Sequence, residues 1–255
     1  MKKTILLMLI IVCAIIFGVS AFRLITYFYA DREAEKSFAG LLPAELADAD
    51  AMDLANTESE YDKLLPHYEA LRDQNDDFVG WLRIPGTRIS YPVMQTTWSP
   101  EYYIDRDFEE KYSASGTLFA DAINNVELPS DVVTIYGHRM KTGAMFGSLG
   151  DFLKTDFLLE HDTIIFDTFS GRYEYKVYLA FSIDVSKPDS FQYHRYNMFK
   201  GPEEFNDYLE QLSKLKHIEN PVNKPSFGDK LILLSTCEYT YDDGRLVLVG
   251  VKIDS

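Results

Sequence analysis

Residues 230–253 read KLILLSTCEYTYDDGRLVLVGVKI, and this stretch decides the class of the fold. Two apolar runs flank a polar segment that contains Asp-Asp-Gly. Aliphatic runs rich in Val and Ile favour strands, whereas Asp and Gly favour turns. The pattern therefore predicts two strands joined by a turn or loop, with Cys237 at the end of the first strand and Arg245 at the start of the second.

Six further runs of the same kind precede this pair, and most are bounded by Gly, Pro, Asn or Asp. They are FVGWLRIPG (78–86), ISYPVMQ (89–95), SGTLFAD (115–121), VVTIYGH (132–138), TIIFDTF (163–169) and YEYKVYLAFSID (173–184). Many short strands separated by turn residues are typical of an all-β domain. The sequence therefore predicts one mostly antiparallel barrel or sandwich.

Three segments with helical character accompany the strands. Residues 202–215 begin with a proline and two glutamates, which favour a helix N-terminus, and they carry an apolar face. The residues of that face are Phe205, Leu209, Leu212 and Leu215. A short helix is expected over residues 143–153. A longer one over residues 60–76 is expected to pack on the domain that follows it.

The N-terminus differs from the rest of the chain. Residues 4–22 are 19 residues without a charge, and at about 1.5 Å per residue they would span about 28 Å of a bilayer. Lys2 and Lys3 favour a cytoplasmic N-terminus. We therefore expect a single-pass anchor within residues 1–30 and an extracellular remainder. A cleaved signal peptide is the alternative, with a weak cleavage site at residues 19–21.

The composition of residues 31–255 excludes some classes of function. Residues 31–59 are expected to form a linker with helical tendency, and residues 60–255 the main folded domain. The chain has a net charge of −15, made of +3 in residues 1–30 and −18 beyond them. An acidic domain argues against nucleic-acid binding. The two cysteines exclude a disulfide scaffold, because Cys13 lies in the predicted span and leaves Cys237 as a lone thiol.

Cys237 and His138 are the first candidates for chemistry. Each ends an apolar run, and a strand end holds a side chain on a rigid support at the mouth of a barrel. A thiol with a nearby imidazole can serve as a nucleophile with its general acid or base. The alternatives are an inert buried cysteine and a loop histidine that is exposed to solvent or hydrogen-bonded within the protein. The remaining histidines are assigned surface or structural roles; they are His67, His161, His194 and His217.

Arg245 is the third candidate, and its position depends on the turn before it. A tight turn at residues 242–244 would place Tyr241 opposite Arg245 and leave Cys237 about 13 Å away, at about 3.3 Å per residue. An open loop over residues 238–244 would instead return Arg245 beside the thiol. The segment EYTYDDG permits both geometries, and a solvated arginine is the alternative to a functional one.

Taken together, TIYGHRM, LLSTCEY and the arginine eight residues after the cysteine resemble the sortase family of membrane-anchored cysteine transpeptidases. The resemblance covers about residues 60–254, and LSTC is similar to the TLxTC-type motif of the family. The helix inserted before Cys237 is similar to that of class B sortases. One departure is Arg139, where many class B members carry Asn. The resemblance implies a closed eight-stranded β-barrel with an N-terminal helix and a long helix before the nucleophile strand.

The resemblance also implies a mechanism. A sorting motif near the C-terminus of a secreted protein is cleaved at a Thr carbonyl, and the acyl group is transferred to an amine of the Gram-positive cell wall. Cys237 forms the thioester, His138 moves protons, and Arg245 with the backbone N–H of Glu238 stabilises the oxyanion. Ser235, Thr236, Glu238 and Ile104 are expected to contact the substrate. No cofactor and no metal site are expected.

Other functions remain compatible with the same residues. A surface cysteine peptidase would use the same nucleophile but transfer the acyl group to water, and a pilin-polymerising sortase would use a lysine acceptor. An anchored binding module with an inert Cys237 is the non-enzymatic alternative. A papain-like protease is disfavoured, because there the cysteine precedes the histidine, whereas here His138 precedes Cys237.

Overall fold

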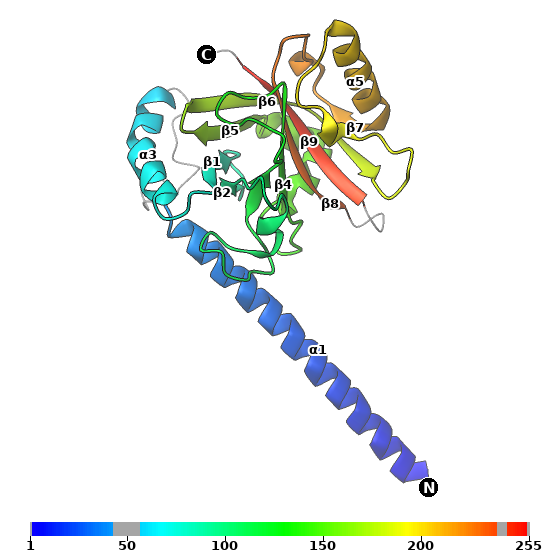
Figure 1. Ribbon diagram of the computed structural model, residues 1–255. Helices are drawn as coiled ribbons and strands as arrows, with labels where there is room; N and C mark the ends of the chain where they lie inside the picture. Colours follow the sequence, from blue (N-terminus) through cyan, green and yellow to red (C-terminus); the bar gives the residue numbers. More distant parts are fainter. Residues whose placement is uncertain (1, 43–56, 239–243, 254–255) are drawn as a thin grey trace.

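The computed structural model describes residues 2–42, 57–238 and 244–253. It consists of a β-rich domain from which one long helix projects, so that the N-terminus lies far from the domain (Figure 1). The helices are α1 (Lys2–Ala39), α3 (Thr57–Arg72), α4 (Thr155–Glu160) and α5 (Pro202–Leu215). Short 3-10 helices are η3 (Tyr102–Asp105), η4 (Gly147–Leu153), η5 (Tyr193–Arg195) and η6 (Pro221–Asn223).

The strands of the described residues join into one sheet. They are β1 (Phe78–Arg83), β2 (Ser90–Met94), β3 (Leu118–Ala120), β4 (Val132–Gly137), β5 (Thr163–Thr168), β6 (Gly171–Asp184), β7 (Lys216–Glu219), β8 (Leu231–Glu238) and β9 (Gly244–Lys252). The order β5-β1-β2-β3-β4-β8-β9-β6 closes on itself through pairing of β5 with β6. The closed eight-stranded, mostly β barrel is confirmed. Its pairs are antiparallel except for β2–β3 and β4–β8.

β7 is a ninth strand that the sequence analysis missed. It pairs with β6 outside the closed ring, over Leu179–Phe181. Its sequence is the short, polar KHIE, which has neither alternating hydrophobicity nor a turn residue before it. The strand therefore depends on the edge that β6 offers after its pairing with β5 ends, and not on the propensity of its own residues.

The predicted helices form with some changes in their bounds. α5 spans the predicted residues and buries Phe205, Leu209 and Leu212. The segment 143–153 is helical only from Gly147 and only as 3-10 helix. α3 ends at Arg72 because Asn75 is buried and donates to Tyr103 Oη and the Phe108 carbonyl (2.9 and 2.7 Å), which draws the chain away from the helix.

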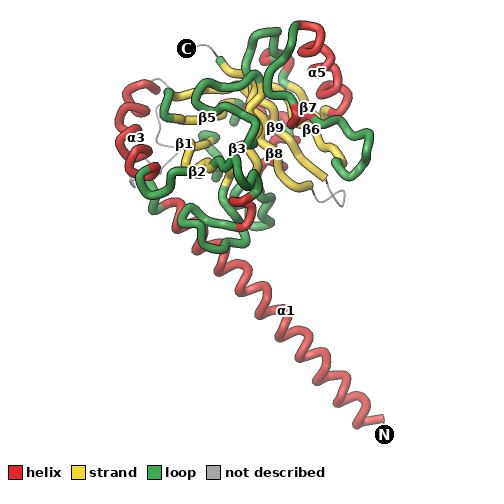
Figure 2. The backbone as a smooth tube through the Cα atoms, viewed as in Figure 1, coloured by secondary structure: helices red, strands yellow, loops and turns green. Residues whose placement is uncertain are grey.

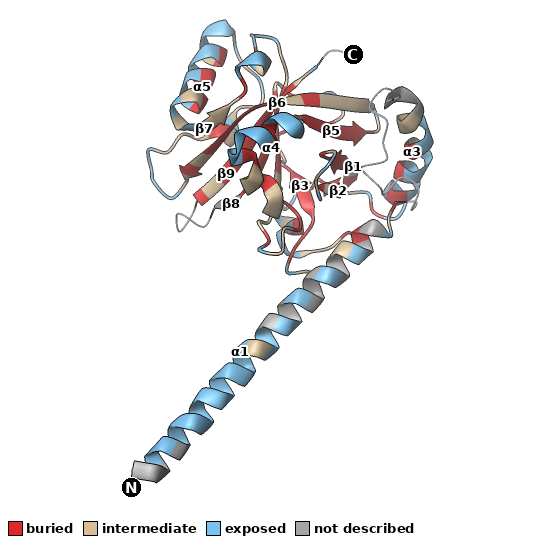
Figure 3. Ribbon diagram, turned by 180° about the vertical axis from the view of Figure 1, so that it is seen from behind, coloured by how far each residue is buried: buried red, intermediate tan, exposed pale blue. Residues whose placement is uncertain are grey.

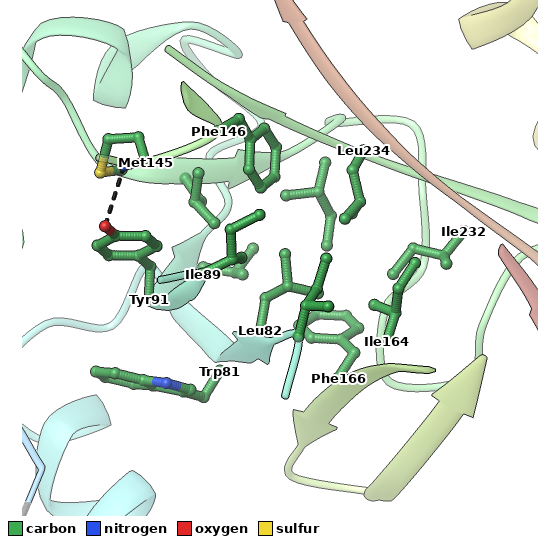
Figure 4. Packing of buried hydrophobic residues seen from close by; sticks show 14 of the residues in the cluster. Trp81, Leu82, Ile89, Tyr91, Met145, Phe146, Ile164, Phe166, Ile232 and Leu234 are labelled. Atoms are coloured by element: carbon green, nitrogen blue, oxygen red, sulfur yellow. Dashed lines mark hydrogen bonds between the residues drawn. The ribbon is translucent and has the colours of Figure 1, made fainter. Parts of the chain in front are cut away.

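Two layers of apolar side chains hold the fold together. One fills the barrel, where Leu82, Phe166 and Leu234 pack together, and continues beneath α3 (Figure 4). The other lies between the outer face of the sheet and α5, whose Tyr208 and Leu212 are fully covered. α3 and α5 lie at opposite ends of the domain, with the strands of the barrel and their loops between them (Figure 2).

α1 is exposed along most of its length (Figure 3). Only its end meets the domain, where Phe38 and, just after the helix, Leu42 are buried in the barrel cluster. In the part of the chain that the structure describes, no helix has the length and apolar character needed to cross a membrane. The expected anchor is therefore not confirmed by the structure.

A buried charge cluster fastens α3 to the barrel. Asp167 of β5 is fully buried and lies within 3.2 Å of Arg83 and 2.8 Å of Arg172. Tyr68 of α3 donates its hydroxyl to the same carboxylate (2.9 Å). A buried charge is tolerated only when its partners replace the lost water. The Asp167 carboxylate therefore ties Tyr68 of α3 to the two barrel arginines.

We predict that Asp167→Asn lowers the free energy of unfolding by about 3–5 kcal/mol, because it leaves the buried Arg83 without its anion and leaves Arg172 with Glu60 alone. Urea unfolding of wild type and variant measures this. Asp151→Asn is the matched control: its ion pair with Lys154 is exposed, and such pairs contribute about 0–1 kcal/mol. An Asp167→Asn loss no larger than that of the control would contradict the account.

Candidate active site

Three adjacent strands bring the predicted catalytic residues to one end of the barrel. β4 and β8 are parallel, with Gly137 opposite Thr236, so His138 follows at the level of Cys237. β8 and β9 are antiparallel, with Cys237 directly opposite Arg245. Neighbouring strands lie about 4.8 Å apart. The backbones at Cys237 and Arg245 are therefore direct neighbours, and His138 begins beside them.

This register decides between the two turn geometries. Cys237 and Arg245 are direct partners, and β8 continues by one residue to Glu238 before the chain returns at Gly244. The expectation that Arg245 lies beside Cys237 is therefore confirmed, and the register that puts Tyr241 opposite Arg245 is wrong. Residues 239–243 themselves lie outside the described residues. The side chains of Cys237 and Glu238 lie outside the described part of the structure, so their backbone positions define the site.

The His138 ring is oriented by a hydrogen bond to η3. Its Nε2 forms a hydrogen bond of 2.7 Å with the Ile104 carbonyl. A carbonyl only accepts, so Nε2 carries the proton and the neutral ring keeps Nδ1 as its proton acceptor. Just before it, Gly137 leaves no room for a side chain, since a Cβ there would lie 2.3 Å from Leu118. The hydrogen bond to Ile104 thus orients the ring at the end of β4, with Nδ1 available.

A pocket of about 290 Å³ lies over these strand ends. Its lining includes the expected residues His138, Arg245, Ser235, Thr236 and Ile104. The other lining residues are Pro100, Glu101, Thr117, Phe119, Asp121, Tyr136, Gly137, Val185, Tyr193 and His194. The structure therefore brings the described members of the predicted site into one cavity.

Polar groups line the floor of this pocket. Ser235 is buried, and its Oγ forms a hydrogen bond of 2.7 Å with the Tyr193 hydroxyl. Tyr136 donates its hydroxyl to Asp121 (2.8 Å), and burial together with that carboxylate raises the pKa of Tyr136. Thr236 Oγ1 is buried and has no hydrogen-bond partner among the described residues. A hydroxyl that lacks a partner in a cavity lining is suited to contact a ligand.

Arg245 supplies the positive charge of the site. Its guanidinium donates to the Gly244 carbonyl (3.1 Å). Its charge opposes the rise in the pKa of Tyr136 that burial causes, and it adds to the fall in the pKa of His194 that burial causes. Its field therefore reaches across the pocket from β9 to the β6–β7 connection. A permanent cation at the strand end can stabilise a developing oxyanion.

His194 lines the pocket, which the sequence analysis did not predict. It lies in η5 and lines the pocket, whereas a surface or structural role was expected. Burial lowers its pKa, Arg195 and Arg245 lower it further, and Asp121 opposes them. The polar context FQYHRY concealed this, although its regularly spaced aromatic residues indicated burial: Tyr193, the preceding residue, is fully covered.

The other histidines lie away from the site, as expected. His67 is exposed on α3, His217 is exposed on β7, and His161 contacts the Pro85 carbonyl at 3.2 Å. Within residues 2–42, 57–238 and 244–253, no three His, Cys, Asp or Glu side chains are close enough to hold a metal ion.

Comparison with known proteins identifies relatives of this chain. The family model for the Sortase domain matches residues 82–253. The chain is 28% identical to sortase B of Staphylococcus aureus over 97% of this chain and 95% of that protein. It is 32% identical to sortase B of Listeria monocytogenes over 71% of each chain. The structure of a Staphylococcus aureus sortase B–substrate complex superposes with a TM-score of 0.67, at 29% identity, over 78% of this chain and 95% of that one.

The lowered pKa of His194 gives a prediction for stability against pH. The unfolded chain binds the proton more tightly than the folded one, so His194 costs stability as pH falls below its unfolded pKa of about 6.5. Above that pH the cost is absent. His194→Gln should therefore lose less unfolding free energy than wild type between pH 7.5 and pH 5.

Chemical denaturation at a series of pH values measures this difference. His67→Gln, at an exposed position of α3, is the matched control and should follow the wild-type curve. A His194→Gln curve that runs parallel to wild type throughout this pH range would show that His194 does not cause the loss of unfolding free energy at low pH.

Proposed function

The chain belongs to the sortase family of cysteine transpeptidases and is similar to its class B members, and we propose that it attaches secreted proteins to the cell wall. In this proposal the enzyme cleaves a sorting motif near the C-terminus of its substrate and transfers the acyl part to an amine. The observation that carries the proposal is the β4–β8–β9 register, which sets the backbones of Cys237 and Arg245 opposite each other with His138 one residue past β4. His138 and Arg245 line the pocket.

The first half-reaction forms a thioester. The Cys237 thiolate attacks the carbonyl carbon of the motif threonine, and the negative charge moves to the carbonyl oxygen. Arg245 and the backbone N–H of Glu238 stabilise that oxyanion. His138 as imidazolium protonates the departing amide nitrogen, and the C–N bond breaks while the carbonyl re-forms.

The second half-reaction releases the product. The incoming amine attacks the thioester carbonyl, and neutral His138 accepts its proton through Nδ1, the nitrogen that its bond to Ile104 leaves available. The C–S bond breaks and the Cys237 thiolate leaves. The imidazolium that results is the acid needed for the next cycle, so one histidine serves both steps.

We propose that the pocket binds the sorting peptide. Ile104, Phe119 and Val185 offer an apolar wall, and the Ser235 and Thr236 hydroxyls offer hydrogen bonds near the nucleophile. Glu238 continues β8 past Cys237 and is assigned to the same groove. The structural relative with a bound substrate supports a peptide as ligand, and the acceptor is assigned to a cell-wall amine.

We also propose that residues 4–22 anchor the enzyme in the cell membrane with the N-terminus inside and the catalytic domain outside. The support is the uncharged sequence and the row of exposed apolar side chains along α1, including Ile11, Ile15 and Phe22. Exposed apolar surface on this scale is costly in water.

Variants of the three proposed catalytic residues should separate their roles in peptide cleavage. Cys237→Ala should abolish turnover of a sorting peptide, because no thioester can form. His138→Asn should reduce kcat by about 10²–10⁴, and Arg245→Ala by about 10²–10³. Turnover is measured with a fluorogenic peptide that contains the motif. Cys13→Ala, which changes the other cysteine, is the control and should retain wild-type activity.

Added amines distinguish transpeptidation from its alternatives. With triglycine present, mass spectrometry should find the amide product in excess over the free acid. A product that is free acid alone would identify a hydrolytic peptidase, and a preference for a lysine side chain would identify pilin polymerisation. Full turnover by Cys237→Ala would contradict the mechanism itself.

The anchor predicts where the protein lies in the cell. The full chain should sediment with membranes and resist extraction by salt, whereas a chain that begins at residue 31 should be released. Substituting Ile11 and Ile15 with Asp should release the full chain as well, because each acid at the centre of a bilayer costs about 2.5–3.5 kcal/mol. A double-Asp variant that stays in the membrane fraction would contradict the anchor.

A further inference from the structure

The catalytic histidine is followed by a loop that closes back on it. This His138 loop, residues 139–146, returns so that the Phe146 N–H donates to the His138 carbonyl (3.0 Å). Arg139 and Met145 form a β-bridge within it, and the Gly143 N–H donates to the Met140 carbonyl (3.0 Å). The conformation of this loop therefore contributes to the position of the His138 backbone.

One residue of the loop has a conformation that needs support from outside. Met145 has φ 51°, in the left-handed region that side chains other than glycine rarely adopt. Such a residue persists only where its surroundings fix it. It lies immediately before Phe146, which closes the loop on His138, so a relaxation at Met145 would move the closing bond.

Tyr91 of β2 provides that support. Its hydroxyl accepts a hydrogen bond from the Met145 N–H (3.0 Å), as Figure 4 shows. Tyr91 is itself buried, and its ring packs edge-on against Phe38 of α1, with 5.7 Å between the ring centroids. Phe38 is likewise buried. A chain of contacts thus runs from the end of α1 through one tyrosine to the strained residue of the loop.

Arg88 forms a second bridge between the same two segments. One terminal nitrogen of its guanidinium donates to the Thr142 carbonyl of the loop (2.8 Å), and the other pairs with the Glu35 carboxylate of α1. The guanidinium fork lets one side chain hold both partners at fixed geometry. Two independent contacts therefore join the end of α1 to the His138 loop.

We infer that Tyr91 and Arg88 are positioning residues for catalysis: they transmit the packing of the α1 end, Glu35–Leu42, to the loop that places His138. Neither residue lines the catalytic pocket, so they act through the backbone of the loop. Since the Ile104 carbonyl orients the ring through Nε2, that bond and the loop together determine where Nδ1 lies. The segment next to the proposed anchor is thereby part of the catalytic framework.

This inference deepens the proposed function and rests on it for its kinetic readout. The test uses the full chain in detergent micelles and compares wild type with Tyr91→Phe, which removes only the hydroxyl. Tyr112→Phe is the matched control, because that tyrosine is 76% exposed. Peptide turnover gives kcat and KM, and hydrogen exchange followed by mass spectrometry reports on residues 139–147.

Tyr91→Phe should lower kcat about three- to tenfold with KM unchanged, and amide exchange in the His138 loop should become faster. Arg88→Lys, which keeps the charge but loses the fork, should change both readouts in the same direction. Tyr112→Phe should match wild type in both.

The outcomes that overturn the inference differ from those that overturn the proposed function. Wild-type kcat or wild-type exchange in Tyr91→Phe would overturn the positioning role. An equal change in kcat and KM that follows a loss of thermal stability would also overturn it, in favour of a merely structural role. Failure of the wild-type chain to cleave any sorting peptide would overturn the proposed function, and the exchange measurement would still decide whether Tyr91 holds the loop.

Discussion

The pairing of β8 between β4 and β9 is the constraint on which the rest of the structure depends. A slip of one residue between β8 and β9 would move Cys237 away from Arg245. Because side chains alternate across a strand, it would also turn the buried side chains of β8 to the opposite face of the sheet. The apolar residues Leu231–Leu234 prevent such a slip, because they are fully buried. The packing that stabilises the barrel is therefore also what aligns the site.

Parallel pairing of β4 with β8 imposes a second requirement. Parallel neighbours cannot be joined by a hairpin and need a long connection, and here that connection is residues 138–230. It contains β5, β6, α5 and β7, and it contributes Val185, Tyr193 and His194 to the pocket. The same segment that allows His138 and Cys237 to lie side by side thus builds one wall of the cavity above them.

The elements that could be predicted from the sequence are those with a local pattern or motif of their own. The apolar runs identified the eight strands of the ring, and the Pro-Glu-Glu start marked α5 at its observed bounds. The register at Cys237 could not be decided, since Asp-Asp-Gly permits two turn geometries, and pairing with β4 and β6 selects one. β7 and the pocket position of His194 depend on contacts between distant segments. No local pattern in KHIE indicates the strand, and the aromatic residues of FQYHRY indicate burial but not a place in the pocket.

In the proposed mechanism Cys237 carries the acyl group between donor and acceptor. Intact-mass spectrometry of the full chain, quenched in acid after mixing with a sorting peptide but no amine, detects that acyl-enzyme. We expect a mass increase equal to the peptide's N-terminal fragment, located on Cys237 by digestion and discharged when an amine is added. Peptide cleavage without such an adduct, or an adduct on any other residue, would contradict it.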